Sequence, residues 1–231
     1  MRIAIIPARG GSKRITHKNI KLFNGKPIIH YAISAAILSN IFDRVIVSTD
    51  DEEIAKVAKE QGAEVPFMRP ASLADDYTPT VPVISHAIKA CQRMGWEVIE
   101  ACCIYPAVPF ISIDDLRIAY EKLMNTNHDF VFPVTQFPSP IQRALRRSHN
   151  GTVSPFHPEH VVTRTQDLEP GYFDVGQFYW GKSSSWLNKV NIHQNSTTLV
   201  IPEWRSVDID TLADWERAEL LYAAILQKVK I

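Results

Sequence analysis

The sequence lacks several features that mark common protein classes. Its 231 residues include three cysteines, Cys91, Cys102 and Cys103, and the last two are neighbours in an apolar run. Cysteines so few and so placed do not form a disulfide framework, and free thiols indicate a reducing compartment. No apolar run approaches the ~20 residues that a membrane-spanning helix needs. We therefore expect a cytoplasmic protein without a membrane partner.

A net charge of one sign is lacking as well, because 25 Lys and Arg residues balance 25 Asp and Glu residues. This balance argues against a nucleic-acid partner, which would favour an excess of positive charge. The first residues, one cation and then a strand-like run, do not match a secretory signal. A chain of this length can bury a sizeable core in one domain with an appendage.

Apolar, β-branched segments alternate with amphipathic helical patterns along most of the chain. Strands are expected over 2–7, 44–48, 97–105, 129–134, 178–180 and 197–201, and helices over 27–38, 51–61, 79–94, 112–124 and 211–228. Capping boxes are expected at Ser112 with Asp115 and at Thr211 with Asp214. This alternation predicts an α/β fold, in which helices cover both faces of a mostly parallel, Rossmann-like sheet.

The alternation stops between Thr135 and Val175. This stretch contains five prolines, several arginines and little periodicity. A long irregular insertion in a compact domain is usually functional. We therefore divide the chain into an α/β domain, formed by residues 1–134 and 176–231, and an insertion of residues 135–175.

The first candidate site follows the first expected strand, where Ala8–Arg14 forms a glycine-rich loop. Gly10 and Gly11 can adopt positive φ and leave backbone N–H groups uncovered. The cations of this region are Arg9, Lys13, Arg14 and Lys18. The spacing matches neither the Walker loop nor the dinucleotide fingerprint. We predict a polyphosphate-binding loop, the alternative being a solvated basic loop.

A second candidate site is the pair Asp208 and Asp210 in Val-Asp-Ile-Asp. On a strand, residues two apart face the same side. Two carboxylates on one face provide oxygen ligands for a hard divalent cation such as Mg²⁺. Alternatively, Asp210 could simply interact with the dipole of the next helix. Because the chain also has a polyphosphate loop, we favour a Mg²⁺ site formed by both aspartates.

At this point the sequence resembles the nonulosonic-acid cytidylyltransferases, the CMP-sialic acid synthetases and their relatives. The matching segments are Ile3–Lys13, Lys18-Asn19, Arg69-Pro70, Tyr105-Pro106, Gly176–Gly181 and Val207–Thr211. Within the family, Gly176-Gln-Phe-Tyr-Trp-Gly181 is most similar to the pseudaminic acid branch. The resemblance implies a nucleotidyltransferase-type fold and Mg²⁺-dependent transfer of CMP from CTP to an acidic nine-carbon sugar.

The resemblance also assigns roles to individual residues. Those implied to bind CTP are Ala8, Arg9, Gly10, Gly11, Ser12, Lys13, Lys18, Asn19, Arg69 and Thr80. The implied catalytic residues are Lys18, Arg9, Asp208 and Asp210, and the last two are implied to bind the metal. The candidate sugar-binding residues are Tyr105, Arg143, Arg164, Gln177 and Tyr179. No side chain stands out as the general base.

Tyr105 departs from the family pattern, because sialic acid synthetases usually have a sugar-contacting glutamine in its place. This change indicates another sugar. Pseudaminic acid has a methyl group and a second N-acyl group, which suit an aromatic lining. N-acetylneuraminate, legionaminate and the eight-carbon Kdo are alternative sugars. A non-catalytic nucleotide or phosphosugar sensor is the alternative of another class.

The insertion contains apolar residues that need a surface to pack against, among them Phe137, Ile141, Phe156 and Val161. It has too little periodicity to form a core of its own. The resemblance implies that it docks on a second subunit and brings residues to the sugar site of that subunit. We therefore expect a twofold homodimer.

Overall fold

The computed structural model describes residues 1–229, and its largest feature is a mixed seven-stranded sheet. The strands are β1 (Arg2–Pro7), β4 (Arg44–Ser48), β5 (Glu100–Ile104), β6 (Phe130–Gln136), β9 (Tyr172–Asp174), β10 (Phe178–Lys182) and β11 (Ser196–Val200). Their order is β11-β6-β10-β5-β1-β4, and β9 also pairs with β6. β4, β1 and β5 are parallel, β11 is parallel to β6, and β9 and β10 run against their neighbours. The predicted α/β fold with a mostly parallel sheet is confirmed.

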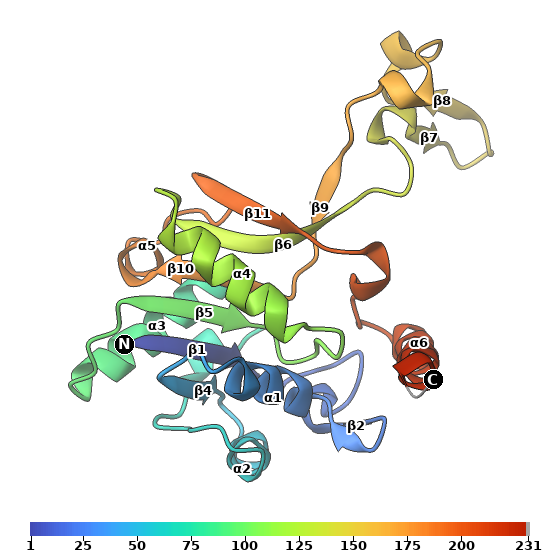
Figure 1. Ribbon diagram of the computed structural model, residues 1–231. Coiled ribbons are helices and arrows are strands. Elements are labelled where there is room, and N and C mark those ends of the chain that lie inside the picture. Colours follow the sequence, from blue (N-terminus) through green and yellow to red (C-terminus); the bar gives the residue numbers. More distant parts are fainter. Residues whose placement is uncertain (230–231) are drawn as a thin grey trace.

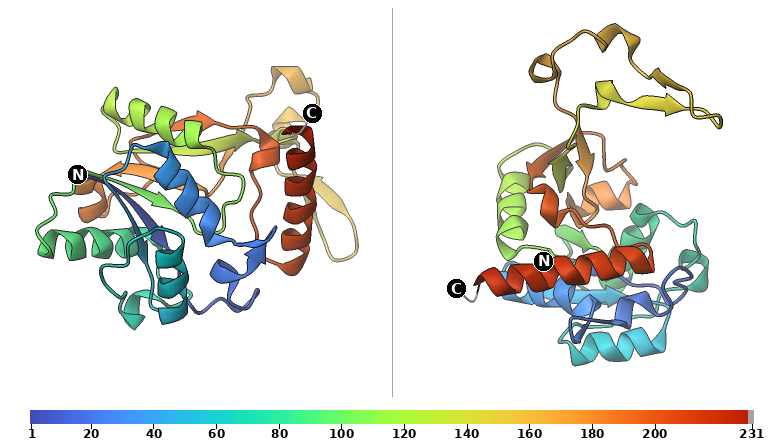
Figure 2. Two further views of the ribbon diagram at one scale, coloured as in Figure 1. Left: turned by 60° about the horizontal axis from the view of Figure 1, so that its bottom comes forward. Right: turned by 90° about the vertical axis from the view of Figure 1, so that its right-hand side faces the viewer.

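Helices cover both faces of this sheet, as Figures 1 and 2 show. They are α1 (Ile29–Ser39), α2 (Glu52–Glu60), α3 (Thr80–Arg93), α4 (Ile113–Met124), α5 (Ser183–Leu187) and α6 (Leu212–Val229). Alternation along β1 explains the two layers. Ala4 and Ile6 are fully buried with residues of α1, α2 and α4, whereas Ile3 and Ile5 are fully buried with residues of α3 and α5. A strand that is apolar on both sides needs a helix layer on each.

The last helix, α6, lies apart from these layers and packs on a small hairpin of β2 (Leu22–Phe23) and β3 (Lys26–Pro27). The ring of Phe23 lies edge-on to Tyr31 and to Trp215, at centroid distances of 5.6 and 5.5 Å. This separate aromatic cluster fixes the segment that leads into α6. Across residues 1–229, no helix combines the length and the apolar character needed to cross a membrane.

The two predicted capping boxes have different outcomes. At α6 the box is confirmed: Asp214 accepts the N–H of Thr211 at 2.9 Å, and its own N–H donates to the Thr211 hydroxyl at 3.2 Å. At α4 the prediction is wrong, because Ser112 makes no side-chain cap. The Asp115 carboxylate instead accepts a hydrogen bond of 2.5 Å from Arg205. A charged donor holds a carboxylate more strongly than a neutral amide does.

Several element boundaries also differ from the prediction, and two of these differences have a clear cause. The helix expected to begin at Pro27 begins at Ile29, because Pro27 pairs with Leu22 in the small hairpin. The strand expected over 97–105 is limited to Glu100–Ile104, the part that pairs with β1 and β10. Both differences come from strand pairing, a local hairpin in the first case and distant strands in the second.

Between β6 and β9 the chain leaves the sheet and forms a projecting arm, residues 137–171 (Figure 1). The arm contains a hairpin of β7 (Leu145–Arg147) and β8 (Val153–Pro155). Gln136 pairs with Tyr172, so both ends of the arm meet at one point of the sheet. Within the predicted insertion of residues 135–175, the two margins are therefore strand residues.

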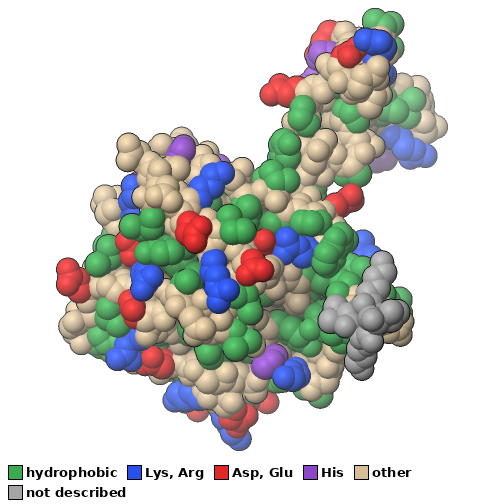
Figure 3. Space-filling model, viewed as in Figure 1, with side chains coloured by type: hydrophobic (Ala, Val, Ile, Leu, Met, Phe, Trp, Pro, Cys, Tyr) green, Lys and Arg blue, Asp and Glu red, His purple; other side chains and the backbone are tan. Residues whose placement is uncertain are grey.

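Apolar side chains are exposed along the arm. Phe137, Ile141, Phe156 and Val161 are 38, 43, 47 and 54% exposed, and Val162 is 92% exposed. Figure 3 shows hydrophobic side chains both at the base of the arm and at its tip. Large apolar patches on a projecting segment are typical of interaction surfaces.

Candidate active site

The carboxyl ends of β1, β4 and β5 meet at one edge of the sheet, where loops surround a cavity of about 690 Å³. Ligands of doubly wound sheets bind at such an edge. Most of the lining comes from residues 9–19, 69–80, 105–108 and 207–210. Motifs that are far apart in the sequence therefore come together in this one cavity.

The loop after β1 is anchored inside the fold. Ala8 is fully buried, and its N–H donates to the carbonyl of Ser48 at 3.0 Å. The positive φ expected at Gly10 and Gly11 is not found, because neither lies among the described glycines with a left-handed backbone. A Cβ at Gly10 would instead lie 2.6 Å from a carboxylate oxygen of Asp51, the N-cap of α2. Close approach, rather than φ, requires glycine at this position.

A left-handed residue does occur further along the loop. His17 has φ of 51° and precedes the short turn Lys18–Ile20. Such a conformation is uncommon for a residue with a side chain, and it clusters at functional loops. The buried Asn19 donates from Nδ2 to the carbonyl of Arg9 at 2.9 Å. Asn19 therefore shapes the loop, and Lys18 lines the cavity beside it.

Two cations at the start of the loop share one carboxylate. Arg9 Nη1 lies 2.7 Å from one oxygen of Asp76, and Lys13 Nζ lies 2.6 Å from the other. Lys13 and Arg9 hold the pKa of the Asp76 carboxyl below its usual value, and the group is charged at neutral pH. Ser12 also lines this part of the cavity.

The other two cations share Asp210. Arg14 donates from both terminal nitrogens to the two oxygens of Asp210, at 2.8 and 2.9 Å. Lys18 Nζ lies 3.6 Å from the same carboxylate, and its side chain is 20% exposed. The loop and the segment 207–210 are thus joined by charge across the cavity.

Asp208 and Asp210 lie in a segment that is neither helix nor strand, so the strand geometry assumed for the pair is not found. Both nevertheless line the cavity, because Ile209 between them is only 1% exposed and is held in the α6 cluster. Burial and the nearby Asp210 raise the pKa of the Asp208 carboxyl. Two carboxylates that repel each other at one cavity are suited to a cation.

Within the described part of the chain, no group of three or more His, Cys, Asp and Glu side chains is arranged to hold a metal ion. Mg²⁺ does not need such a group. It generally uses one or two carboxylates and completes its shell with water and substrate phosphates. Asp208 and Asp210 fit that kind of site.

Next to the loop, Arg69 is 6% exposed and is held by its backbone and its side chain. Its N–H donates to the carbonyl of Thr49 at 2.7 Å, and Nη2 lies 3.4 Å from Asp50. Burial lowers the pKa of the guanidinium, and Asp50 acts in the opposite direction. Arg69 and Thr80, at the start of α3, bound the segment that crosses the cavity.

Tyr105 borders the same cavity, and its hydroxyl lies 2.6 Å from that of Thr80. Tyr179 packs edge-on behind it at a centroid distance of 5.6 Å and donates to Asp174 at 2.9 Å. His193 lies 3.0 Å from the same Asp174 oxygen. Burial raises the pKa of Tyr105 to about 12 and raises that of Tyr179 further. Both hydroxyls therefore stay protonated at neutral pH.

A family model described as "Cytidylyltransferase" matches residues 3–169. The chain belongs to the cytidylyltransferase family. A pseudaminic acid cytidylyltransferase of Campylobacter jejuni is 44% identical over 221 residues, which cover 95% of each chain. A CMP-N,N'-diacetyllegionaminic acid synthase of Legionella pneumophila is 32% identical over 229 residues, again 95% of each chain.

A solved structure shows the same fold at low sequence identity. It is CMP:2-keto-3-deoxy-manno-octonic acid synthetase complexed with CTP, which is 15% identical and has a TM-score of 0.69. The match covers 96% of this cytidylyltransferase and 98% of that chain.

Among the proposed sugar-binding residues of this cytidylyltransferase, Gln177 and Tyr179 lie behind the cavity wall rather than on it. Gln177 is 4% exposed and donates from Nε2 to the carbonyl of Arg205 at 2.6 Å. Tyr179 supports the ring of Tyr105 from behind. Within one chain, Tyr105 is therefore the member of this set that lines the cavity, while Gln177 and Tyr179 hold neighbouring segments in place.

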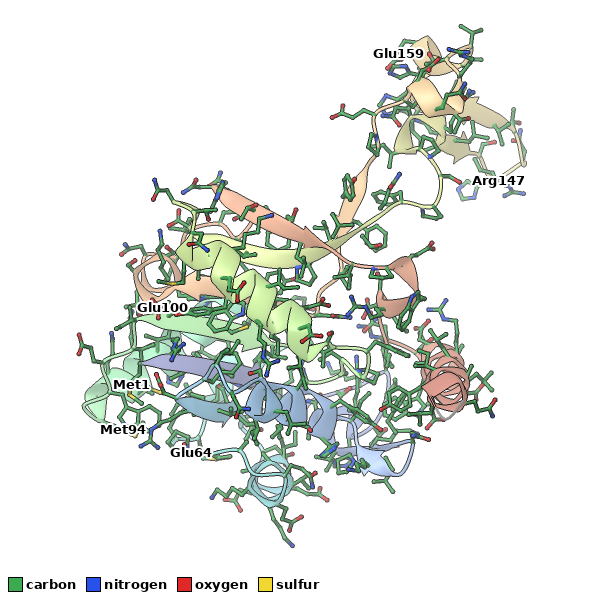
Figure 4. All side chains as sticks on the ribbon, viewed as in Figure 1. Met1, Glu64, Met94, Glu100, Arg147 and Glu159 are labelled. Atoms are coloured by element: carbon green, nitrogen blue, oxygen red, sulfur yellow. The ribbon has the colours of Figure 1, made fainter. Side chains whose placement is uncertain are left out.

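The other two, Arg143 and Arg164, lie on the projecting arm. Arg143 donates to the carbonyls of Val161 and Thr163, and Arg164 donates to Asp167 at 2.8 Å. Their contacts are thus within the arm, and neither lines the cavity of its own chain. Figure 4 shows the labelled arm residues Arg147 and Glu159 far from the body of the molecule.

Three functional contacts were not assigned from the sequence. Asp76 pairs with two loop cations, Asp50 accepts from Gly10 at 3.2 Å and faces Arg69, and Asp174 fixes Tyr179. Asp50 lies between an expected strand and an expected helix, and Asp76 lies between two expected helices. Asp174 gave no such signal, since it lies in the stretch that lacks periodicity.

Proposed function

We propose that this cytidylyltransferase transfers CMP from CTP to the anomeric hydroxyl of pseudaminic acid, and that CMP-pseudaminic acid and pyrophosphate are its products. The observation that carries the proposal is the single cavity in which the cations of the loop after β1 face Asp208 and Asp210. The name of the 44% identical relative supports the choice of sugar.

The reaction places its main demand on charge stabilisation. The anomeric oxygen forms a bond to the α-phosphorus, the bond from that phosphorus to the β-phosphate oxygen breaks, and pyrophosphate leaves with the electron pair. The hydroxyl proton passes to solvent. Phosphoryl transfer of this kind depends on positioning and on cations that match the developing charge. Lys18, Arg9 and Lys13 line the cavity and are suited to that role.

Asp208 and Asp210 would hold a Mg²⁺ ion, which neutralises phosphate charge when it is bound. The cation is proposed from the donor set alone. Arg69 and Thr80, which also line the cavity, would contact the nucleoside. Because CTP is a cytosolic nucleotide, we place the reaction in the cytosol.

The acidic sugar would enter beside Tyr105, whose ring borders the cavity. We propose that the protein is a homodimer in which the arm of one subunit brings Arg143 and Arg164 to the sugar carboxylate at the partner's site. The exposed apolar residues of the arm support this arrangement, because they need a surface to cover them.

A pyrophosphate-release assay with CTP, Mg²⁺ and a panel of sugars tests the proposal. We expect turnover with pseudaminic acid, a product mass equal to that of its CMP-sugar, and no turnover when UTP replaces CTP. Asp208→Asn gives the background rate. If none of the sugars supports pyrophosphate release, a non-catalytic sensor is favoured. Preference for N-acetylneuraminate or legionaminate would change the identity of the sugar but not the reaction.

A further inference from the structure

Two adjacent carboxylates in the segment 71–79 have different partners. Asp75 faces its own backbone and accepts the N–H groups of Tyr77 and Thr78 at 2.9 and 2.6 Å. Asp76 points the other way and bridges Arg9 and Lys13 at 2.7 and 2.6 Å. Asp75 therefore makes the turn, and the turn presents Asp76 to the loop after β1.

Asp76 holds the cations that the proposed function gives to the triphosphate. Each of its oxygens sits on one cation, as two phosphate oxygens would. A carboxylate and a phosphate cannot occupy the same donors together. Phosphate oxygens that bind these N–H groups of Arg9 and Lys13 therefore displace the Asp76 carboxylate.

The segment that bears Asp76 can move with a small change in free energy. Tyr77 is 91% exposed, and none of residues 71–79 is buried. The anchors lie at the ends, where Arg69 is buried and Thr80 begins α3. Segments with few buried contacts open with small free energies.

Asp210 also pairs with two cations, but phosphate binding would affect it differently. It holds Arg14 and Lys18, yet it would gain a Mg²⁺ ion when phosphate takes those cations. Among the residues described, the cations within salt-bridge reach of Asp76 are Arg9 and Lys13. No other cation of this described part is there to pair with Asp76 once phosphate binds these two. Phosphate binding would thus leave Asp76 without its cation partners, whereas Asp210 would exchange its partners for the proposed Mg²⁺ ion.

We propose that Asp76 is a counter-charge that competes with the β- and γ-phosphates for Arg9 and Lys13, and whose return favours release of pyrophosphate. This inference rests on the proposed function. It makes Asp76 a specificity-determining residue, because a ligand with one phosphate at the nucleoside end does not have to displace it. A triphosphate or pyrophosphate must do so.

Titration calorimetry tests this proposal by measuring the affinities of inorganic pyrophosphate, CTP and CMP. The buffer contains Mg²⁺ and no sugar. We expect Asp76→Asn to bind pyrophosphate and CTP about three- to tenfold more tightly, since exposed ion pairs are each worth a small factor. CMP affinity should change by less than about twofold on the same scale. Product inhibition by pyrophosphate should strengthen by the same factor as its binding.

Two variants serve as matched controls. Asp75→Asn removes one charge from the neighbouring residue and keeps an acceptor for the turn, so it should leave pyrophosphate affinity near that of the wild type. Asp76→Glu keeps the charge and should restore the wild-type affinities. Unchanged or weaker pyrophosphate binding in Asp76→Asn, or equal tightening of CMP, would overturn the proposal.

The outcomes also separate this inference from the proposed function. If the wild type makes CMP-pseudaminic acid but Asp76→Asn binds pyrophosphate as the wild type does, the counter-charge is wrong and the function stands. If Asp76→Asn tightens pyrophosphate but the protein turns over no sugar with CTP, the counter-charge stands and the function is wrong.

Discussion

Side chains at the cavity owe their positions to residues that do not touch it. Ile209 is 1% exposed and fixes the segment on which Asp208 and Asp210 face the cavity. Gly10 allows the loop after β1 to approach Asp51, where a Cβ would lie within 2.6 Å of a carboxylate oxygen. At the residue scale, the site is therefore set by burial and close approach, and the charged groups follow.

The aspartate pair gives the first prediction. Asp208→Asn and Asp210→Asn should each lower kcat by orders of magnitude while changing the melting temperature little, because they remove the proposed metal ligands from a partly exposed cavity wall. Steady-state kinetics and thermal unfolding measure the two effects. Asp114→Asn, the same change at an 80% exposed side chain of α4, is the control. Near-wild-type rates in both variants would contradict the metal assignment.

The second prediction concerns the sugar. The ring of Tyr105 borders the cavity. A hydrogen bond between the Tyr105 and Thr80 hydroxyls holds this ring in one position. We expect kcat/KM for pseudaminic acid to exceed that for N-acetylneuraminate by at least ~100-fold, equivalent to about 2.7 kcal/mol. Tyr105→Gln should narrow this gap. Competition between the two sugars, read by product mass, measures it; preferential formation of CMP-N-acetylneuraminate by the wild type would refute the prediction.

At the residue scale, the sequence revealed groups but not their partners. The loop cations and the aspartate pair could be identified because each lies in a short motif, and the structure brings them to one cavity. Asp76 could not be assigned to Arg9 and Lys13, since a contact between residues 63 apart depends on where two loops lie in the fold. Asp174 was missed for another reason, because it lies in the stretch that lacks periodicity.

At the scale of elements, periodicity was a good guide where an element packs on one surface. Helices α2 and α3 lie where the sequence predicts them, because acids or proline at the start and glycine at the end define each one. The direction of β10 could not be predicted, because alternation shows that a strand is buried and not which neighbour it pairs with. The prediction of a cap at α4 failed for a similar reason, because Asp115 binds the distant Arg205 instead.

That distant contact gives the third prediction. Asp115 and Arg205 form a pair in which the side chains are 10 and 14% exposed, and the pair ties the segment before Asp208 to α4. Breaking one partner of a buried pair leaves a charge without compensation, so Asp115→Asn should lower the free energy of unfolding by about 3 kcal/mol.

Urea unfolding followed by circular dichroism measures this loss, and Asp114→Asn on the same helix is the matched control, because its carboxylate is 80% exposed. Equal unfolding midpoints for the two variants would show that the pair does not stabilise the fold. Gln177 donates a hydrogen bond to the carbonyl of Arg205. We expect this hydrogen bond to be lost as well when Asp115→Asn loosens the segment.

At the scale of the whole molecule, the arm is the part that one chain does not explain. Its apolar residues are exposed, and Arg143 and Arg164 donate hydrogen bonds within the arm. The sequence indicated an irregular insertion from its prolines but could not give its shape, because no local pattern encodes a projecting hairpin. A second subunit would cover the apolar residues and would place the arginines near a sugar.

The last prediction tests that assembly with mixed dimers. Asp208→Asn removes a proposed metal ligand, and Arg164→Ala removes a proposed sugar contact of the arm. If the arm serves the partner's site, a mixed dimer has one complete site, with an intact Asp208 in one subunit and an intact Arg164 in the other. Mixing the two inactive variants should then restore roughly a quarter of wild-type activity, because random exchange makes half of the dimers mixed and each has one working site of two.

The control is a mixture of Asp208→Asn and Asp210→Asn, which should restore no activity because neither subunit has a complete metal site. Light scattering should give the mass of a dimer at micromolar concentration, since exposed apolar residues of the arm would otherwise face water. An active monomer would contradict the dimer. No restoration, from variants that light scattering shows to be dimeric and to exchange subunits, would mean that Arg164 acts within its own chain or not at all.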